Sequence, residues 1–244
     1  MSKVVCIVQA RTGSTRLPGK VLRIVEGKSL LEHLVDRLQQ CERINQIVLA
    51  TTDKESDQAI VDIAQKLGVG WFQGSEEDVL SRYLGAAQAY EADIIVRVTS
   101  DCPLIDPETI DQAVNLYTKS NVDYASNTIE RTYPRGLDTE TFSLEALFKA
   151  DALAVEGPNR EHVTLYMYRH PDTFKLTNLA APAVLSRPDL RLCVDTQEDF
   201  DLIAAIYSEL YREGEIINIR DVIALLERKP ELAQINTHVE QKHV

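Results

Sequence analysis

Apolar runs and amphipathic stretches alternate along the first half of the chain. Short apolar runs, each with the length of a buried strand, cover residues 4–8, 47–50, 69–72 and 93–98. Between them, apolar positions recur every three or four residues, as in a helix with one buried face, over residues 29–38, 56–67 and from 75 onward. Strands that alternate with helices at this spacing predict parallel βαβ units. We therefore expect an α/β fold with a mostly parallel central sheet.

Residues suited to helix ends lie where these helices should begin and stop. Ser29 can cap the first helix, and Gly68 suits the residue just after the second one. Asp106 and Pro107 together indicate a further helix start, because Pro is favoured at the first helical position. Asp78 is interpreted as completing a capping box with Ser75.

The pattern changes from about residue 124. Short strands are expected at 124–127 and 139–142, and further strands at 174–179 and 190–194. Helices are expected at 144–154, at 160–169 with Asn159 as its cap, from Thr196 to 210, and at 220–228. The polar end, residues 236–244, is expected to fray. No repeat or linker interrupts the chain, so we expect one domain over 1–244 with an insertion at 124–185.

Composition limits the classes of partner. Apolar residues make up 44% of the 244 positions, enough for a sizeable core. The net charge of −12 argues against binding nucleic acid or an anionic membrane, since both attract positive potential. No run approaches the roughly 18 apolar residues of a membrane span. Four cysteines without a pairing pattern fit a reducing compartment, so we expect a cytoplasmic protein: Cys6, Cys41, Cys102 and Cys193.

A basic loop, residues 9–20 with the sequence QARTGSTRLPGK, follows the first apolar run. Arg11, Arg16 and Lys20 can bind phosphate oxygens, while Gly13 and Gly19 let the backbone approach a ligand closely. Five residues separate the two glycines and no Ser or Thr follows the lysine, so the loop is not a P-loop. We favour a triphosphate site over the alternative, a solvated basic turn, because the cations and hydroxyls gather directly after a strand.

Two aspartates also follow predicted strands. Asp101 comes after the run at 93–98, and Asp195 after the one at 190–194. Because ligands bind at the carboxyl ends of parallel strands, one crevice can collect such residues. Two carboxylates beside a phosphate site suit Mg²⁺, which prefers one or two carboxylates, waters and substrate phosphates. The alternatives are a turn before Pro103 for Asp101 and a position before a helix cap for Asp195.

Two further side chains have open roles. Arg82, one turn after Asp78, can pair with that carboxylate or reach a nucleobase. His162 next to Glu161 is interpreted as a structural hydrogen-bonding residue, with a catalytic role as the alternative. The five histidines form no metal-ligand spacing, so no zinc site is expected.

These motifs resemble those of the sugar cytidylyltransferases, the family of 3-deoxy-manno-octulosonate and acylneuraminate cytidylyltransferases. The basic loop is similar to the family's N-terminal signature, and ATTD, GSEEDVLSRY, RVTSDCPLIDP, YPRGLDTETF, NREHVT and LRLCVDTQEDF follow in the order of its spore-coat polysaccharide branch. The resemblance covers roughly residues 3–210. The chain departs from the octulosonate enzymes at Ser100-Asp101-Cys102-Pro103, where those enzymes carry Gly-Asp-Glu-Pro.

The resemblance implies a GT-A-like nucleotidyltransferase fold, a three-layer α/β/α sandwich, and Mg²⁺-dependent transfer of CMP from CTP to a sugar or sugar acid. It implies catalytic roles for Arg11, Lys20 and Asp101, and metal binding by Asp101 and Asp195. The implied nucleotide-binding residues are Ala10, Arg11, Gly13, Arg16, Lys20, Thr51, Arg82 and Asp101. Candidate acceptor contacts are Tyr133, Arg135, Asp138 and Glu140. A homodimer is expected, with the 124–185 insertion serving acceptor binding or dimerisation.

The sequence is also compatible with three other functions. A related transferase could use GTP on a sugar phosphate, because base choice depends on few contacts. A GT-A glycosyltransferase typically carries a D-x-D metal motif after its central strand, which Ser100-Asp101-Cys102 lacks. A non-catalytic nucleotide-binding module would not need the metal carboxylates, yet both aspartates are present.

Overall fold

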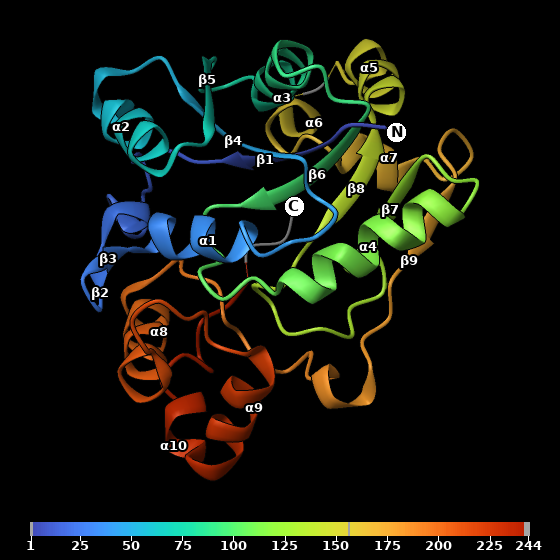
Figure 1. Ribbon diagram of the computed structural model, residues 1–244. Helices are drawn as coiled ribbons and strands as arrows, with labels where there is room; N and C mark the ends of the chain where they lie inside the picture. The colour runs from blue at the N-terminus through green and yellow to red at the C-terminus, as the bar shows by residue number, and fades with distance from the viewer. Residues whose placement is uncertain (1, 156, 242–244) are drawn as a thin grey trace.

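A seven-stranded sheet forms the centre of the protein over residues 2–155 and 157–241, which a computed structural model describes (Figure 1). Its order is β5-β4-β1-β6-β8-β7-β9, and only β8 runs antiparallel to its neighbours among these strands. The strands are β1 (Val4–Gln9), β4 (Gln46–Thr52), β5 (Gly70–Gly74), β6 (Ile94–Thr99), β7 (Tyr124–Ser126), β8 (Glu140–Ser143) and β9 (Leu176–Asn178). The predicted mostly parallel sheet is confirmed.

Helices cover both faces of this sheet. One layer holds α1 (Leu30–Leu38), α2 (Gln58–Leu67) and α4 (Pro107–Lys119), which share a core cluster with Cys6 and Val8 of β1. The other holds α3 (Val79–Ala89), α5 (Leu144–Leu153) and α7 (Leu165–Arg169), which share a second cluster with Val5 and Ile7. Alternate residues of β1 face opposite layers, as the period of two in a strand requires. The three-layer α/β/α sandwich is therefore confirmed.

A C-terminal group of helices packs against one edge of the sandwich (Figure 1). It comprises α8 (Gln197–Leu210), α9 (Ile219–Arg228) and α10 (Pro230–Ala233). A third core cluster joins this group to Leu17 of the basic loop and to Leu30 at the start of α1. The remaining elements are η1 (Lys20–Leu22), β2 (Ile24–Val25), β3 (Lys28–Ser29), η2 (Glu55–Asp57), α6 (Gly157–Glu161) and η3 (Ala183–Leu185).

Several predicted helix ends are confirmed. Ser29 caps α1 in a capping box with Glu32, and Gly68 ends α2 with a φ of 68°. Asp106 caps α4, whose first residue is Pro107, as predicted. Asp78 is itself the cap of α3, accepting from the Ser81 N–H at 2.9 Å. Ser75 is therefore not the helix cap, although its hydroxyl accepts from the Asp78 N–H at 3.0 Å, one of the two bonds of the predicted box.

Two expected elements of the second half are wrong. The helix at 160–169 is divided into α6 and α7, because Val163 between them has a φ of 46°. A β-branched residue rarely adopts this conformation, and periodicity carries no sign of it. Residues 190–194 form no sheet strand but a single bridge, Arg135 to Arg191. Asp195 therefore lies after an irregular segment that packs on a loop.

The expected insertion supplies structure to the sandwich itself. Strands β7, β8 and β9 extend the central sheet, and α5 and α7 belong to one of its layers. The expected fraying of the C-terminal end is wrong at Asn236, whose exposed fraction is only 3%, while residues 242–244 lie outside the described part. No helix in the described residues is long and apolar enough to cross a membrane.

Candidate active site

A cavity of about 300 Å³ opens at the carboxyl ends of β1 and β6. The basic loop forms one wall, the start of α3 forms another, and Glu161 and His162 close the far side. It brings together seven of the predicted residues, which are Ala10, Arg11, Arg16, Lys20, Arg82, Asp101 and Asp195. Gly13 and Thr51 are not among its lining residues.

The basic loop is held in one conformation by hydrogen bonds. The Thr12 carbonyl accepts from the Gly19 N–H at 3.0 Å, and Gly19 has a φ of 66°, which favours glycine. Asp57 accepts from both the N–H (2.7 Å) and the hydroxyl (2.6 Å) of Thr12, and also from the hydroxyl of Thr52. Asp57 was missed in the sequence, because nothing local shows that it faces a loop 45 residues earlier.

Lys20 joins the loop to both predicted metal-binding carboxylates. Its Nζ lies 3.2 Å from Asp101 Oδ2 and 2.8 Å from Asp195 Oδ1, and it donates to the Val194 carbonyl at 2.8 Å. Burial alone would lower the pKa of Lys20, but the two carboxylates outweigh it and the net shift is upward. Burial alone would raise the pKa of Asp101, but Lys20 outweighs it and the net shift is downward. Both groups are therefore charged at neutral pH.

Asp195 is held by two arginines as well. Its Oδ2 lies 3.0 Å from Arg16 Nη2 and 2.9 Å from Arg191 Nη2. Arg191 in turn pairs with the fully buried Asp199 through two bonds of 2.8 and 3.0 Å. Sequence reasoning missed Arg191, although the spacing of four residues to Asp195 offered a weak signal.

The donor set fits a magnesium ion. Asp101 and Asp195 both lie within 3.2 Å of the same ammonium nitrogen, and their side chains are 22% and 13% exposed toward the cavity. Two carboxylates with room for waters and phosphate oxygens match the preference of Mg²⁺. Among the described residues no group of three or more His, Cys, Asp or Glu could hold a metal, so an all-protein cage is absent there.

The start of α3 forms the side of the cavity predicted to bind the nucleotide. Arg82 is 3% exposed and donates through Nη1 to the Ser75 carbonyl, not to Asp78. Its Nε is buried without a hydrogen-bond partner. The hydroxyl of Thr51 at the end of β4 is buried and unpartnered too. Buried polar groups usually have partners, so the unpartnered Arg82 Nε is notable because Arg82 lines the cavity, whereas Thr51 does not.

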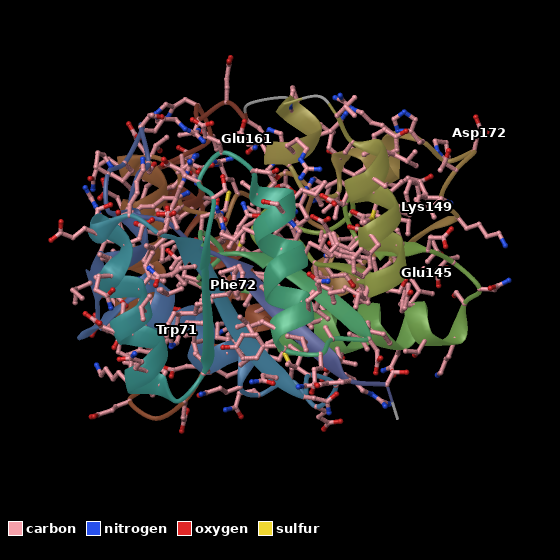
Figure 2. The ribbon with its side chains drawn as sticks, turned by 90° about the horizontal axis from the view of Figure 1, so that it is seen from above. Trp71, Phe72, Glu145, Lys149, Glu161 and Asp172 are labelled. Carbon is pink, nitrogen blue, oxygen red and sulfur yellow. The ribbon has the colours of Figure 1, made fainter. Side chains whose placement is uncertain are left out.

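Asp78 connects the start of α3 to α6, the helix just before the cavity residue His162. It accepts two hydrogen bonds from Arg160, at 3.0 and 2.6 Å, and so joins α6 to the start of α3. Figure 2 shows Glu161 close to the N-terminal end of α3. The neighbouring His162 lines the cavity, and burial lowers its pKa, so the ring is neutral at neutral pH. His162 is thus placed where it can contact a ligand, although the structural role was preferred from sequence.

None of the four candidate acceptor residues lines this cavity. Tyr133 is fully buried in the third core cluster, and Asp138 pairs with Arg131 at 2.8 Å. Arg135 lines a second cavity of about 310 Å³. Glu140 is buried on Arg97, Tyr124 and Thr164. Contact of Tyr133 or Glu140 with an acceptor is contradicted in this conformation, because neighbouring side chains cover both.

Comparison with known proteins bears on this site. The family model described as cytidylyltransferase matches residues 5–239. An uncharacterized protein of Methanocaldococcus jannaschii is 43% identical over 242 residues, 98% of this chain and 97% of its own length. The spore coat polysaccharide biosynthesis protein SpsF of Bacillus subtilis is 36% identical over 239 residues, 96% of this chain and 98% of its own length.

Solved structures agree on the fold. The structure of a cytidylyltransferase from Leptospira borgpetersenii covers all of both chains with a TM-score of 0.90 and 32% identity. A CMP:2-keto-3-deoxy-manno-octonic acid synthetase covers 85% of this chain and 99% of its own, with a TM-score of 0.64 and 20% identity. The predicted nucleotidyltransferase fold is therefore confirmed.

Proposed function

Because this chain belongs to the cytidylyltransferase family, we propose that it transfers CMP from CTP to a sugar acceptor and releases pyrophosphate. An acceptor oxygen attacks the α-phosphorus, the bond from this phosphorus to the β-phosphate oxygen breaks, and pyrophosphate leaves with the electron pair. SpsF is named for polysaccharide biosynthesis, which supports a sugar or sugar acid as the acceptor.

One observation carries the proposal. Lys20 of the basic loop contacts Asp101 and Asp195, which lie far apart in the sequence, and all three line one cavity. A phosphate-binding loop, an ammonium group and two carboxylates in one place are the parts that phosphoryl transfer requires. A solvated basic turn would not place its lysine between two partly buried carboxylates.

The cations have separate proposed roles. Arg11 is 45% exposed and 3.5 Å from Glu76, so its guanidinium is available to a phosphate. Arg16 and Lys20 sit against Asp195, where they can stabilise charge developing on the leaving pyrophosphate. Ala10 and Arg82 are proposed to contact the nucleoside, since both line the cavity and, in the part of the chain that the structure describes, neither is hydrogen-bonded or ion-paired to Asp101 or Asp195.

Asp101 and Asp195 are the residues that would hold Mg²⁺. When bound, this ion would neutralise phosphate charge. Before ligands bind, Lys20 keeps the two carboxylates together despite their like charge. Arg16 and Arg191 hold Asp195 in the same orientation, which reduces the reorganisation needed when the triphosphate enters.

The acceptor is proposed to enter between His162 and the 131–140 loop. His162 can accept a hydrogen bond from an acceptor hydroxyl, because its ring is neutral. Arg135 and Asp138 are partly exposed and are retained as proposed acceptor contacts. A homodimer and a cytoplasmic location remain predictions from sequence.

The test is pyrophosphate release with each of the four NTPs against a panel of sugar acids and sugar phosphates. We expect release with CTP and at least one sugar acid, and its loss in excess EDTA. Release with GTP and a sugar phosphate would instead support the related GTP transferase. Release with no NTP would reject the proposal.

A matched pair of arginine variants controls for general charge effects. Arg16→Ala removes a cation from the cavity, whereas Arg187→Ala removes one from an exposed pair with Asp189. We expect only the first to weaken CTP binding strongly. Equal loss in both variants would argue against a specific role for the basic loop.

A further inference from the structure

The C-terminal segment contributes a buried side chain to the network behind Asp195. Asn236 follows α10 and is only 3% exposed, although the residues on both sides of it are more open to solvent. Its Nδ2 donates to Asp199 Oδ1 at 2.8 Å and to the Arg191 carbonyl at 3.0 Å. A buried amide with both bonds directed at one ion pair needs a physical explanation.

Asp199 is the centre of this network. Its carboxylate is fully buried and accepts from Arg191, Asn236 and the backbone N–H groups of Asp195 (2.9 Å) and Thr196 (3.1 Å). A buried charge is costly unless its hydrogen-bonding capacity is filled. Asn236 therefore completes the partners that keep this carboxylate, and the arginine it holds, in place.

The same atoms determine the position of Asp195. Asp199 holds the Asp195 main-chain nitrogen, and Arg191 holds its Oδ2 at 2.9 Å. A shift of Asp199 would therefore move both the backbone and the carboxylate of Asp195. No other residue of the described C-terminal segment 229–241 is buried as Asn236 is.

We propose that Asn236 is a positioning residue that sets the affinity of the Asp101–Asp195 site for its divalent ion, acting through Asp199 and Arg191. The inference rests on the proposed function, since it assigns the ion to Asp195. Removing Asn236 would leave Asp199 and the Arg191 carbonyl each short of one donor. Loss of a direct partner of a metal ligand typically weakens metal affinity roughly 10- to 100-fold, and Asn236 lies one contact further out, so we expect the lower end of this range.

The alternative is that Asn236 only fastens the end of the chain and Asp199 only caps α8. Asp199 does form a capping box with Thr196, so this role exists. It predicts a loss of stability without a change in metal affinity. The two roles therefore separate when affinity and stability are measured on the same variant.

The experiment compares the wild type with Asn236→Ala, Asn236→Asp and the control Thr237→Ala. Asn236→Asp keeps the shape but replaces the donor with a carboxylate beside Asp199. Thr237 is the exposed neighbour whose hydroxyl donates within its own turn, to the Gln234 carbonyl at 3.2 Å. Mn²⁺ binding is titrated by electron paramagnetic resonance with saturating α,β-methylene CTP, well below each melting temperature, and the Mn²⁺ bound by the same analogue without protein is measured separately and subtracted.

We expect the Mn²⁺ dissociation constant to rise about tenfold in Asn236→Ala and further in Asn236→Asp. The Mg²⁺ concentration for half-maximal pyrophosphate release should rise in parallel, while turnover at saturating Mg²⁺ stays close to that of the wild type. Thr237→Ala should bind Mn²⁺ as the wild type does.

Unchanged Mn²⁺ affinity in both Asn236 variants, with or without a lower melting temperature, would overturn the inference. A wild type that binds no Mn²⁺ with the CTP analogue would instead overturn the assignment of the metal site, and the inference with it. Because the wild type is measured first, the two failures are distinguishable.

Discussion

Two ion-pair clusters, one after the carboxyl end of β6 and one within β6 and β8, use the same chemistry with different exposure. In the cavity, Lys20 holds Asp101 at 3.2 Å, and the Asp101 side chain is 22% exposed. In the sheet, Arg97 of β6 pairs with Glu140 of β8, and each side chain is 11% exposed. The second pair is more completely bonded, since Glu140 also accepts from Tyr124 and Thr164.

The difference shows how this protein separates binding from stability. Cavity charges are satisfied mainly by one another, so an incoming phosphate or metal can replace a partner. The Arg97–Glu140 pair instead connects β6, β8, β7 and the start of α7, and Arg97 also donates to Gln9 Oε1 at 3.0 Å. Removing one member of such a buried pair strongly lowers the free energy of unfolding, because the other charge stays buried without its partner.

The largest expected effect is on turnover, from the cavity. Asp101→Asn and Asp195→Asn should each reduce pyrophosphate release by roughly two to three orders of magnitude, the scale of lost electrostatic stabilisation. Because both carboxylates contact Lys20, they should act as a unit, and the double variant should lose little more than the worse single one. A double-mutant cycle of steady-state rates measures this.

Stability provides the control for that cycle. Independent turn and cap residues would each cost about 1 kcal/mol on substitution, additively, and would leave turnover near normal. Additive stability losses with near-normal turnover would contradict the proposed metal site. They would also show that the cavity charges, like the Arg97–Glu140 pair, serve stability and not binding.

Loss of the buried Arg97–Glu140 pair should lower stability far more than turnover. Glu140→Gln leaves Arg97 charged without its carboxylate, so we expect about 3–5 kcal/mol of lost unfolding free energy. Turnover of the folded fraction should fall far less than in Asp101→Asn. Urea denaturation measures the unfolding free energy of each variant, and pyrophosphate release on the same samples measures its turnover. Unchanged stability would contradict the assigned role of Glu140.

Acid should weaken a third, smaller cluster, in which Glu32 accepts from Lys66 and Ser29. Burial alone would raise the pKa of Glu32, but hydrogen bonds from Lys66 and Ser29 outweigh it and lower the pKa to about 2. A carboxyl with a lowered pKa stabilises the fold above its ordinary value of 4.5 and loses this contribution as the pH falls toward 2.

Glu32→Gln tests this pH dependence while retaining a side chain suited to a capping box. The decline of melting temperature between about pH 5 and pH 2 should be shallower in the variant than in the wild type. Identical slopes would show that Glu32 is not among the carboxyls that determine acid stability.

The smallest effect is expected at the surface. Arg187 pairs with Asp189 at 2.8 Å, and that aspartate's side chain is 60% exposed. Exposed pairs contribute roughly 0–1 kcal/mol, so Arg187→Ala should change the unfolding free energy within this range. If Arg187→Ala lowered the unfolding free energy as much as Glu140→Gln, solvent exposure would not explain the difference between exposed and buried ion pairs.

The first half of the fold was predictable because its signals are local. A strand run, an amphipathic stretch and a capping residue each lie within about a dozen residues, and Ser29, Gly68 and Asp106 mark the observed helix ends. The second half was less predictable, because its irregular parts depend on distant partners. Val163 breaks the expected helix, and residues 190–194 bridge to Arg135 without forming a strand.

The site divides in the same way. Side-chain chemistry identified Arg16, Lys20, Asp101 and Asp195, all of which line the cavity, although the strand expected before Asp195 is absent. The supporting residues were missed, because Asp57, Arg191 and Asn236 act on atoms that only the fold brings near. Candidate acceptor residues Tyr133 and Glu140 have suitable chemistry, yet neighbouring side chains cover them.

The sequence by itself determined the alternation of strands and helices, the cytidylyltransferase family and the charged groups available at the strand ends. These depend on periodicity and residue type, which a chain carries locally. The tertiary structure decided that Lys20 joins two distant aspartates and that Glu140 lies in the core. It also decided that Asn236, which follows α10, bonds to Asp199 in the first turn of α8. Such pairings depend on packing between segments up to 175 residues apart, and no local pattern records them.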